Sequence, residues 1–435
     1  MEPANFWYLV SVVLMLSASG WGSSGGRRAG LVAAVVTGYA VSYWAGGALL
    51  LEPFRFALEP NALDYTRSGF YLNAACISLF CIGALTARAI LPALPIRELV
   101  RGRPSALPAR VAVVALMLTV LSFLLAGILP SSVVTFLRKG LAIFAVAVML
   151  SMDSVGSLGR LSHPVFKAIA FFVLYGVFTL SRGFVGFAVF LSLPLFTMAV
   201  LRTRRVRATL VVAPFLLFAA LSFFVNYMGN RTDLREDLDD GRGAQVALVG
   251  NAKMDAGWFD PRSKSHLLAI DRRLNQNRLA GMARARIASG AIRHGGVAEL
   301  WPALVFWVPR LVWPAKPMYG GSPEVVARAT GLRFGENTSV GVGPPLELYL
   351  AIGFVGAAMV FLLLGVLVEY LDYAAALRLS RGDAWGFMRC ALIGMPFCLS
   401  VDNLPTILGA AWLGVVLLWL VRHGMRLLIP GAEAV

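Results

Sequence analysis

A succession of long apolar runs, separated by short polar connectors, constrains this chain more than any other feature. A hydrocarbon core of roughly 30 Å needs about 20 apolar residues in a helix, and only helices or closed barrels can cross it. The runs are continuous rather than alternating, which favours helices. We therefore expect an all-α polytopic membrane protein with about 11 transmembrane helices, over roughly residues 5–20, 29–51, 70–91, 110–129, 137–152, 164–180, 184–201, 208–228, 344–369, 386–401 and 404–421.

Composition supports this class, because only 14% of the residues are charged against about 25% in soluble domains. The formal net charge of +16 does not indicate nucleic-acid binding, since the basic residues are spread over the connectors between apolar runs. Six connectors carry most of them and fall on one side of the membrane if the spans alternate. They contain Arg27 and Arg28, Arg97 to Arg110, Arg160 and Lys167, Arg202 to Arg207, Arg378 and Arg381, and Arg422 and Arg426. By the positive-inside rule that side is the cytoplasm.

The chain then divides into three parts. Residues 1–229 form an N-terminal bundle of about eight helices, residues 230–342 form one large outer loop, and residues 343–435 contribute about three more helices. In a bacterium the loop lies in the periplasm and the bundle in the inner (cytoplasmic) membrane.

The outer loop has helical and aromatic stretches of its own. Residues 266–292 show helical spacing with a basic face, which predicts an amphipathic helix on the membrane surface or one packed on the outer ends of the spans. Residues 300–312 are apolar and rich in tryptophan, and at about 13 residues they are too short to span. They are typical of an interfacial or re-entrant segment.

Arg182 lies in a predicted three-residue outer turn, Ser181-Arg182-Gly183. Ser181 is suited to cap the following helix, and a guanidinium beside a helix N-terminus suits a phosphate. The alternative is an arginine that extends its charge to the membrane edge.

Arg310 and Lys316 lie in a proline-rich stretch, Pro309 to Pro317, that predicts a rigid, extended backbone. The two cations would face a lipid-linked pyrophosphate or a sugar, or alternatively anchor an interfacial belt. Further candidates for substrate binding are the outer-face residues Arg278, Arg328, Arg333 and Asp402. For Asp402 a solvated loop position is the favoured alternative.

Glu347 lies just inside a predicted span, where a carboxylate is costly and usually functional. It is a candidate general base for a sugar hydroxyl, an ion-pair partner of Arg310 or Arg182, or a solvated helix end. No His, Asp, Glu or Cys cluster has metal spacing, so we predict no metal and no cofactor. The four cysteines lie in apolar runs and are interpreted as small apolar filler.

Two motifs on the predicted outer face resemble a known superfamily. Thr179-Leu180-Ser181-Arg182-Gly183 is similar to the Thr-x-Ser-Arg-Gly turn of bacterial O-antigen polymerases and ligases. The run Pro309-Arg310 through Trp313-Pro314-Ala315-Lys316-Pro317, followed by the stretch from Glu347 to Gly356, resembles oligosaccharide repeat-unit polymerases of the Wzy type. One large outer loop late in the chain matches the same layout.

This resemblance implies a fold of the membrane glycosyltransferase C class and a metal-independent, inverting polymerase. The substrates it implies are oligosaccharide repeat units on undecaprenyl pyrophosphate, joined at the periplasmic face for O-antigen, capsule or exopolysaccharide. Catalytic roles would fall to Arg182, Arg310 and Glu347. A chain-length regulator and a flippase are the partners it implies.

Two other functions stay open. The ligase branch of the superfamily has a histidine shortly before its Gly-x-x-Gly helix start, whereas residues 340–347 contain none. His294 lies far upstream and would match only by folding back, so the sequence favours a polymerase over a ligase. A lipid-linked glycan transporter or flippase is the third hypothesis, and it is disfavoured because the centres of the spans are nearly free of charge.

Overall fold

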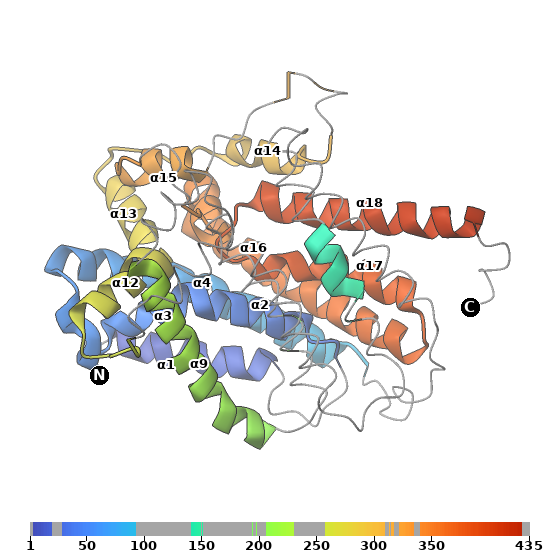
Figure 1. Ribbon diagram of the computed structural model, residues 1–435. Helices are drawn as coiled ribbons and strands as arrows, with labels where there is room; N and C mark the ends of the chain where they lie inside the picture. Colours follow the sequence, from blue (N-terminus) through green and yellow to red (C-terminus); the bar gives the residue numbers. More distant parts are fainter. Residues whose placement is uncertain are drawn as a thin grey trace, which may run out of the picture.

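The computed structural model describes residues 3–19, 28–92, 141–148, 150, 194, 197, 206–229, 257–308, 313, 315–316, 322–334 and 340–428. All regular secondary structure within these ranges is helical (Figure 1). Four of the described helices are long and apolar enough to cross a membrane: Leu31–Leu50, Pro60–Ile90, Pro344–Ser380 and Leu404–Gly424. The fold is therefore that of a helical membrane protein, and the number of spans over the whole chain stays a prediction.

The described helices follow the predicted runs closely in place but less closely in length. They are α1 (Pro3–Ser19), α2 (Leu31–Tyr39), η1 (Ala40–Trp44), α3 (Ala45–Gly47), η2 (Ala48–Leu50), η3 (Glu52–Ala57), α4 (Pro60–Ile90), α9 (Val206–Gly229), α12 (Lys264–Leu274), α13 (Gln276–Ala288), η6 (Val297–Leu300), α14 (Trp301–Leu304), α15 (Ser322–Thr330), α16 (Pro344–Ser380), α17 (Ala384–Gly394), η7 (Met395–Cys398) and α18 (Leu404–Leu428). The predicted spans 110–129 and 164–180 lie outside the described residues. So do most of 137–152 and 184–201, although residues 141–148 are helical.

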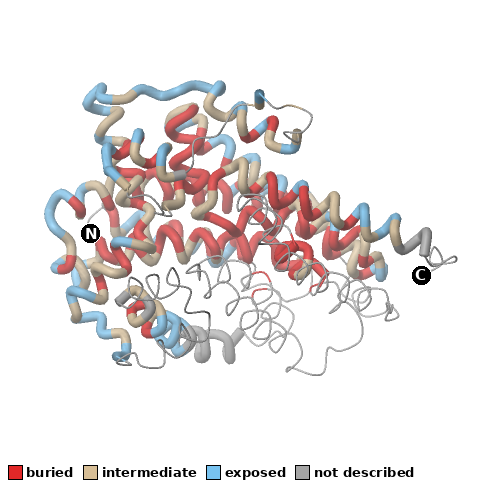
Figure 2. The backbone as a smooth tube through the Cα atoms, turned by 45° about the horizontal axis from the view of Figure 1, so that its top comes forward, coloured by how far each residue is buried: buried red, intermediate tan, exposed pale blue. Residues whose placement is uncertain are grey.

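Helices α4 and α16 form the central contact of the bundle, and glycine allows their backbones to approach closely. A side chain at Gly83 would meet the carbonyl oxygen of Leu362 at 2.1 Å, and one at Gly365 would meet that of Phe80 at 2.0 Å. In a membrane the hydrophobic effect does not drive helices together. Small residues at a helix crossing stabilise the contact instead, because they allow close packing. Figure 2 shows the buried residues as one band through the bundle, with exposed residues at its margins.

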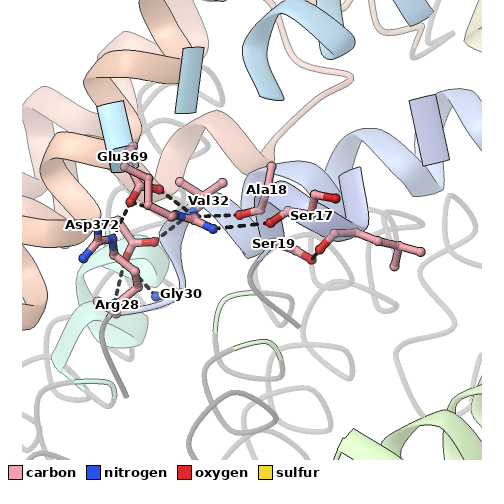
Figure 3. Close-up of polar contacts among 11 residues, drawn as sticks. Ser17, Ala18, Ser19, Arg28, Gly30, Val32, Glu369 and Asp372 are labelled. Atoms are coloured by element: carbon pink, nitrogen blue, oxygen red, sulfur yellow. Dashed lines mark hydrogen bonds and ion pairs between the residues drawn. The ribbon is translucent and has the colours of Figure 1, made fainter. Parts of the chain in front are cut away.

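At one end of the bundle, Glu369 of α16 joins three other elements through buried charge (Figure 3). Its carboxylate is fully buried and accepts hydrogen bonds from Arg28, just before α2, and from Arg88 of α4. The Arg88 guanidinium binds it through Nε at 3.1 Å and Nη2 at 2.7 Å. Nη2 also donates to the carbonyl oxygen of Ala18 in α1 at 2.7 Å. We call this end of the bundle the Glu369 end.

Asp372, one turn further along α16, fixes the start of α2. Its carboxylate accepts from the backbone N–H groups of Ala29 at 2.6 Å, Gly30 at 2.8 Å and Val32 at 3.2 Å. These are N–H groups that a helix N-terminus leaves without intrahelical partners. Arg28, which the sequence places in a cytoplasmic connector, thus also takes part in a buried polar cluster that joins α1, α2, α4 and α16.

The opposite end, at which α4, α16 and α18 begin, is called the Glu347 end. There the helix predicted over residues 266–292 is wrong as a single element, because it breaks at Asn275 into α12 and α13. Its apolar side is buried in the bundle, with Leu267, Ala280 and Ala283 at most 3% exposed. The packed interpretation therefore holds, and the membrane-surface interpretation does not.

Candidate functional site

Helix α16 is broken at Gly353, near the Glu347 end. Gly353 has φ 76° and ψ −176°, a conformation that only glycine adopts readily. Residues 344–352 and 354–380 are therefore two half-helices in sequence, and the first one ends inside the bundle. The last carbonyl groups of such a half-helix need hydrogen-bond donors from elsewhere.

The segment His294-Gly295-Gly296 supplies those donors. Gly295 N–H donates to the carbonyl oxygen of Leu350 at 3.0 Å, and Gly296 N–H donates to that of Ala351 at 2.9 Å. The His294 ring packs edge-on against Tyr349, with centroids 5.2 Å apart, and its Nδ1 lies 2.8 Å from the Tyr349 carbonyl oxygen. The loop is thus fastened to the break in α16 at three consecutive carbonyls.

This contact fixes which nitrogen of His294 carries the proton in the neutral ring. A carbonyl oxygen only accepts, so Nδ1 is the donor and Nε2 keeps the basic lone pair. Nε2 lies 3.7 Å from the position that a Cβ at Gly353 would take. The break in α16 therefore has a proton acceptor beside it, on an exposed residue.

Glu347 lies in the first turns of α16, as the sequence predicts, but it is not solvated. It is 5% exposed, which rules out the solvated helix end. Its Oε2 accepts from the backbone N–H of Leu404 at 2.6 Å, so the carboxylate caps the start of α18. Asn403 adds a second cap, because its Oδ1 accepts from Thr406 N–H at 2.9 Å. Carboxylates are stabilised at such helix N-termini.

Tyr43 connects this site to helix α13. It lies in η1, a π-helical turn after α2, and π-helical turns are frequent at functional sites. Its hydroxyl donates to the carbonyl oxygen of Ser400 at 3.0 Å, close to Gly343 at the start of α16. Its own carbonyl oxygen accepts from Asn277 Nδ2 at 2.6 Å, and Asn277 in turn accepts from Asn73 of α4 at 2.8 Å. A buried polar chain thus runs from the turn before α18 to α13.

The predicted cations of the loop are largely engaged by the chain itself. Arg278 pairs with the buried carboxylate of Asp271 at 2.8 Å, and Arg328 pairs with Glu299 at 2.8 Å. The Lys316 ammonium donates to the carbonyl oxygens of Phe306 at 2.6 Å and Val308 at 3.1 Å.

The other predicted site residues are distributed as follows. Arg333 is exposed just after α15. Asp402 lies half-buried two residues before Leu404, in the same turn that Glu347 caps. Arg182 and Arg310 lie outside the described residues, so the geometry that would join them to Glu347 is a prediction.

Sequence reasoning did not single out Tyr43, Asn73, Asn277 or Ser400, and it set His294 aside. All five take part in contacts over more than 50 residues of sequence. The glycine pair after His294 was the available signal, because Gly296 has φ 76° and such backbone favours glycine. For the other four no comparable signal exists in the sequence.

The described residues hold no group of three or more His, Cys, Asp and Glu arranged for a metal ion. Compared with known proteins, the chain matches no protein-family model, no curated protein and no solved structure. The fold and site define a helical membrane protein with a buried carboxylate and an exposed imidazole at one end. Its resemblance to O-antigen polymerases and ligases stays an expectation.

Proposed function

We propose that this protein is a polymerase of lipid-linked oligosaccharides, which joins repeat units carried on undecaprenyl pyrophosphate at the periplasmic face of the bacterial inner membrane. The Glu347 end of the bundle is then the periplasmic end. The observation that carries the proposal is the buried Glu347 carboxylate in the first half of the broken helix α16. A carboxylate held there is costly and points to function.

The proposed reaction is a single displacement. A hydroxyl oxygen of the incoming repeat unit forms a bond to the anomeric carbon of the other chain, and the bond from that carbon to the pyrophosphate oxygen breaks. The pyrophosphate leaves on its lipid, and the anomeric centre inverts. Arg182 and Arg310 neutralise the charge that grows on the leaving group.

The hydroxyl proton needs an acceptor, and arginine cannot be one at neutral pH. Glu347 is our first assignment. One of its oxygens caps α18, and an ionised carboxylate keeps further lone pairs on both oxygens. The other acceptor at this end is Nε2 of His294.

His294 also favours a second candidate function, the ligase-type transfer of a finished glycan to another acceptor. The sequence argued against a ligase because no histidine precedes the helix start at Gly353. The hydrogen bond from His294 to Tyr349 brings an imidazole to that helix start from 59 residues upstream. The absence of a nearby histidine in the sequence therefore no longer argues against a ligase. The two functions differ only in the acceptor, so they are separated by the product.

The test is a reconstitution in liposomes with a short undecaprenyl-pyrophosphate oligosaccharide, without metal, read as a ladder on a gel. Wild type is run beside Arg182→Ala, Arg310→Ala and Glu347→Gln. Glutamine keeps an acceptor oxygen for Leu404 N–H but cannot take a proton, so we expect Glu347→Gln to fold normally and to lose the ladder.

Glu324→Gln is the matched control, because Glu324 is exposed on α15, and it should give the wild-type ladder. A full ladder from Glu347→Gln would limit Glu347 to capping α18. A ladder lost instead in His294→Gln would move the proton acceptor to the imidazole. Transfer of a single glycan to an added acceptor, with no ladder, would replace the polymerase by the ligase.

A further inference from the structure

Residues 297–308, here called the aromatic segment, present an apolar face to the outside of the protein. Val297, Trp301, Leu304 and Trp307 are 66%, 48%, 57% and 53% exposed. They recur every three or four residues, the spacing that places side chains on one face of a helical path. The opposite face is buried, with Ala303 3% and Val305 8% exposed.

The charge of the aromatic segment is neutralised within the protein. Its one charged residue is Glu299, and the Glu299 carboxylate pairs with Arg328 of α15 at 2.8 Å. The carboxylate also packs over the backbone of Gly295, where a Cβ would be 2.2 Å from its Cδ. No unpaired charge therefore has to be removed from water if the segment enters a membrane.

Several of its backbone groups are hydrogen-bonded within the protein, which an exposed loop in water does not require. Glu299 N–H donates to Gly296 at 3.1 Å, Val305 N–H to Trp301 at 3.0 Å and Val308 N–H to Val305 at 3.1 Å. The carbonyl oxygens of Phe306 and Val308 accept from the Lys316 ammonium. Backbone groups in hydrocarbon must find partners inside the protein, whereas those at a water surface need not.

The position of the segment determines what covers its apolar face. Helix α14 packs against α18, a helix long and apolar enough to span, and lies beside its first turns (Figure 1). Helix α18 exposes apolar side chains of its own, from Trp412 at 36% to Trp419 at 56% further along the helix. The apolar face of the aromatic segment thus continues a surface that faces lipid.

From these observations we propose that the aromatic segment is inserted into the lipid leaflet at the Glu347 end, with Trp301, Leu304 and Trp307 at the boundary between headgroups and acyl chains. Lys316 acts there as an internal cap for two carbonyl groups. Twelve residues are too few to span, so the segment enters and leaves on the same side. Because Gly295 and Gly296 bind the carbonyls at the break in α16, the inserted segment anchors that break to the membrane. None of this depends on the proposed reaction.

The experiment places a nitroxide at Leu304→Cys in the full chain, reconstituted in liposomes, and measures its collisions with oxygen and with a water-soluble nickel chelate. The background carries Cys390→Ala, because the other three cysteines are buried. Leu363→Cys, 63% exposed on α16, is the lipid-facing control. Ser289→Cys, exposed at the end of α13, is the water-facing control.

We expect the label at position 304 to resemble the label at 363 more than the label at 289, with higher oxygen accessibility and lower nickel accessibility than at 289. Adding Lys316→Met should raise its nickel accessibility, because two carbonyl groups then lose their donor and the segment moves toward water. Nickel accessibility equal to that at 289 would overturn the proposal. So would spin–spin broadening at 304 that disappears on dilution with unlabelled protein, because a second copy would then cover the face.

Discussion

Replacing Glu369 by glutamine tests the physical account of the Glu369 end. The fully buried carboxylate accepts from two arginines whose side chains are 14% and 24% exposed. Glu369→Gln removes the negative charge and turns one acceptor oxygen into a donor that faces the guanidinium groups. The arginines would then remain in a largely buried site without their counter-charge.

Breaking a buried pair by removing one partner costs about 3–5 kcal/mol. We take the lower end, about 3 kcal/mol, because both arginines keep some contact with solvent that screens the charge. Unfolding entropies of about 2.1 cal/mol/K per residue give roughly 0.9 kcal/mol/K if all 435 residues unfold together. The apparent midpoint should therefore fall by about 3 °C, and by more if only part of the bundle unfolds.

The cysteines provide the assay. Cys76, Cys81 and Cys398 are buried, so a thiol-reactive fluorophore reports their exposure as the protein is heated in detergent. Glu299→Gln is the matched control, since Glu299 pairs with Arg328 at the surface, where side chains are 31% and 63% exposed. An exposed pair contributes about 0–1 kcal/mol, so its midpoint should move by about 1 °C or less. Equal midpoints for Glu369→Gln and Glu299→Gln would refute the reasoning.

Three further substitutions test the packing. Gly281→Val should separate α13 from α4, because a Cβ at Gly281 would lie 1.8 Å from the Tyr65 carbonyl oxygen; faster limited proteolysis of the loop is the expected readout, and wild-type resistance would contradict it. Asp372→Ala removes the acceptor of three backbone N–H groups at the start of α2. It should lower the free energy of unfolding by about 1–2 kcal/mol, measured by the same thiol assay, and an unshifted midpoint would contradict the capping role. Gly353→Ala should cost about 1–3 kcal/mol from backbone strain alone, because its Cβ would meet nothing closer than 3.7 Å; a stabilised protein would mean that the break in α16 is not strained.

The apolar runs were enough to predict helices, because hydropathy over some 20 residues reflects the cost of crossing a membrane. They were not enough to predict where α4 begins. Residues 60–69 include Asp64 and Arg67, which lower the hydropathy of that stretch. The helix nevertheless starts at Pro60, because this stretch packs against α13 instead of lipid.

The break at Asn275 illustrates a second limit. Apolar residues continue at helical spacing on both sides, so periodicity alone predicts one helix. The side chain of Asn275 donates to Thr66 of α4 at 2.9 Å and to Asp271 at 2.7 Å. Those contacts hold a turn between two helices, and they depend on a residue more than 200 positions away.

The candidate site, too, could be predicted from the sequence only in part. The burial cost of Glu347 was visible in its apolar surroundings, whereas its partner, the N–H group of Leu404, is 57 residues distant. The fold-back of His294 depends on a carbonyl group that α16 exposes only because it breaks at Gly353. The Glu347 contact leaves no trace in local sequence, and the glycine pair after His294 indicates a turn there but not its partner.

The central claim is that this protein forms a glycosidic bond as it breaks the bond between the anomeric carbon and the lipid pyrophosphate. The most direct measurement counts lipid pyrophosphate released per bond formed, in metal-free liposomes that contain only this protein and a labelled undecaprenyl-pyrophosphate oligosaccharide. We predict one pyrophosphate-lipid released for each bond, with products growing by whole repeat units. Labelled oligosaccharide that crosses the bilayer with its pyrophosphate bond intact, and no release, would contradict the account and identify a transporter.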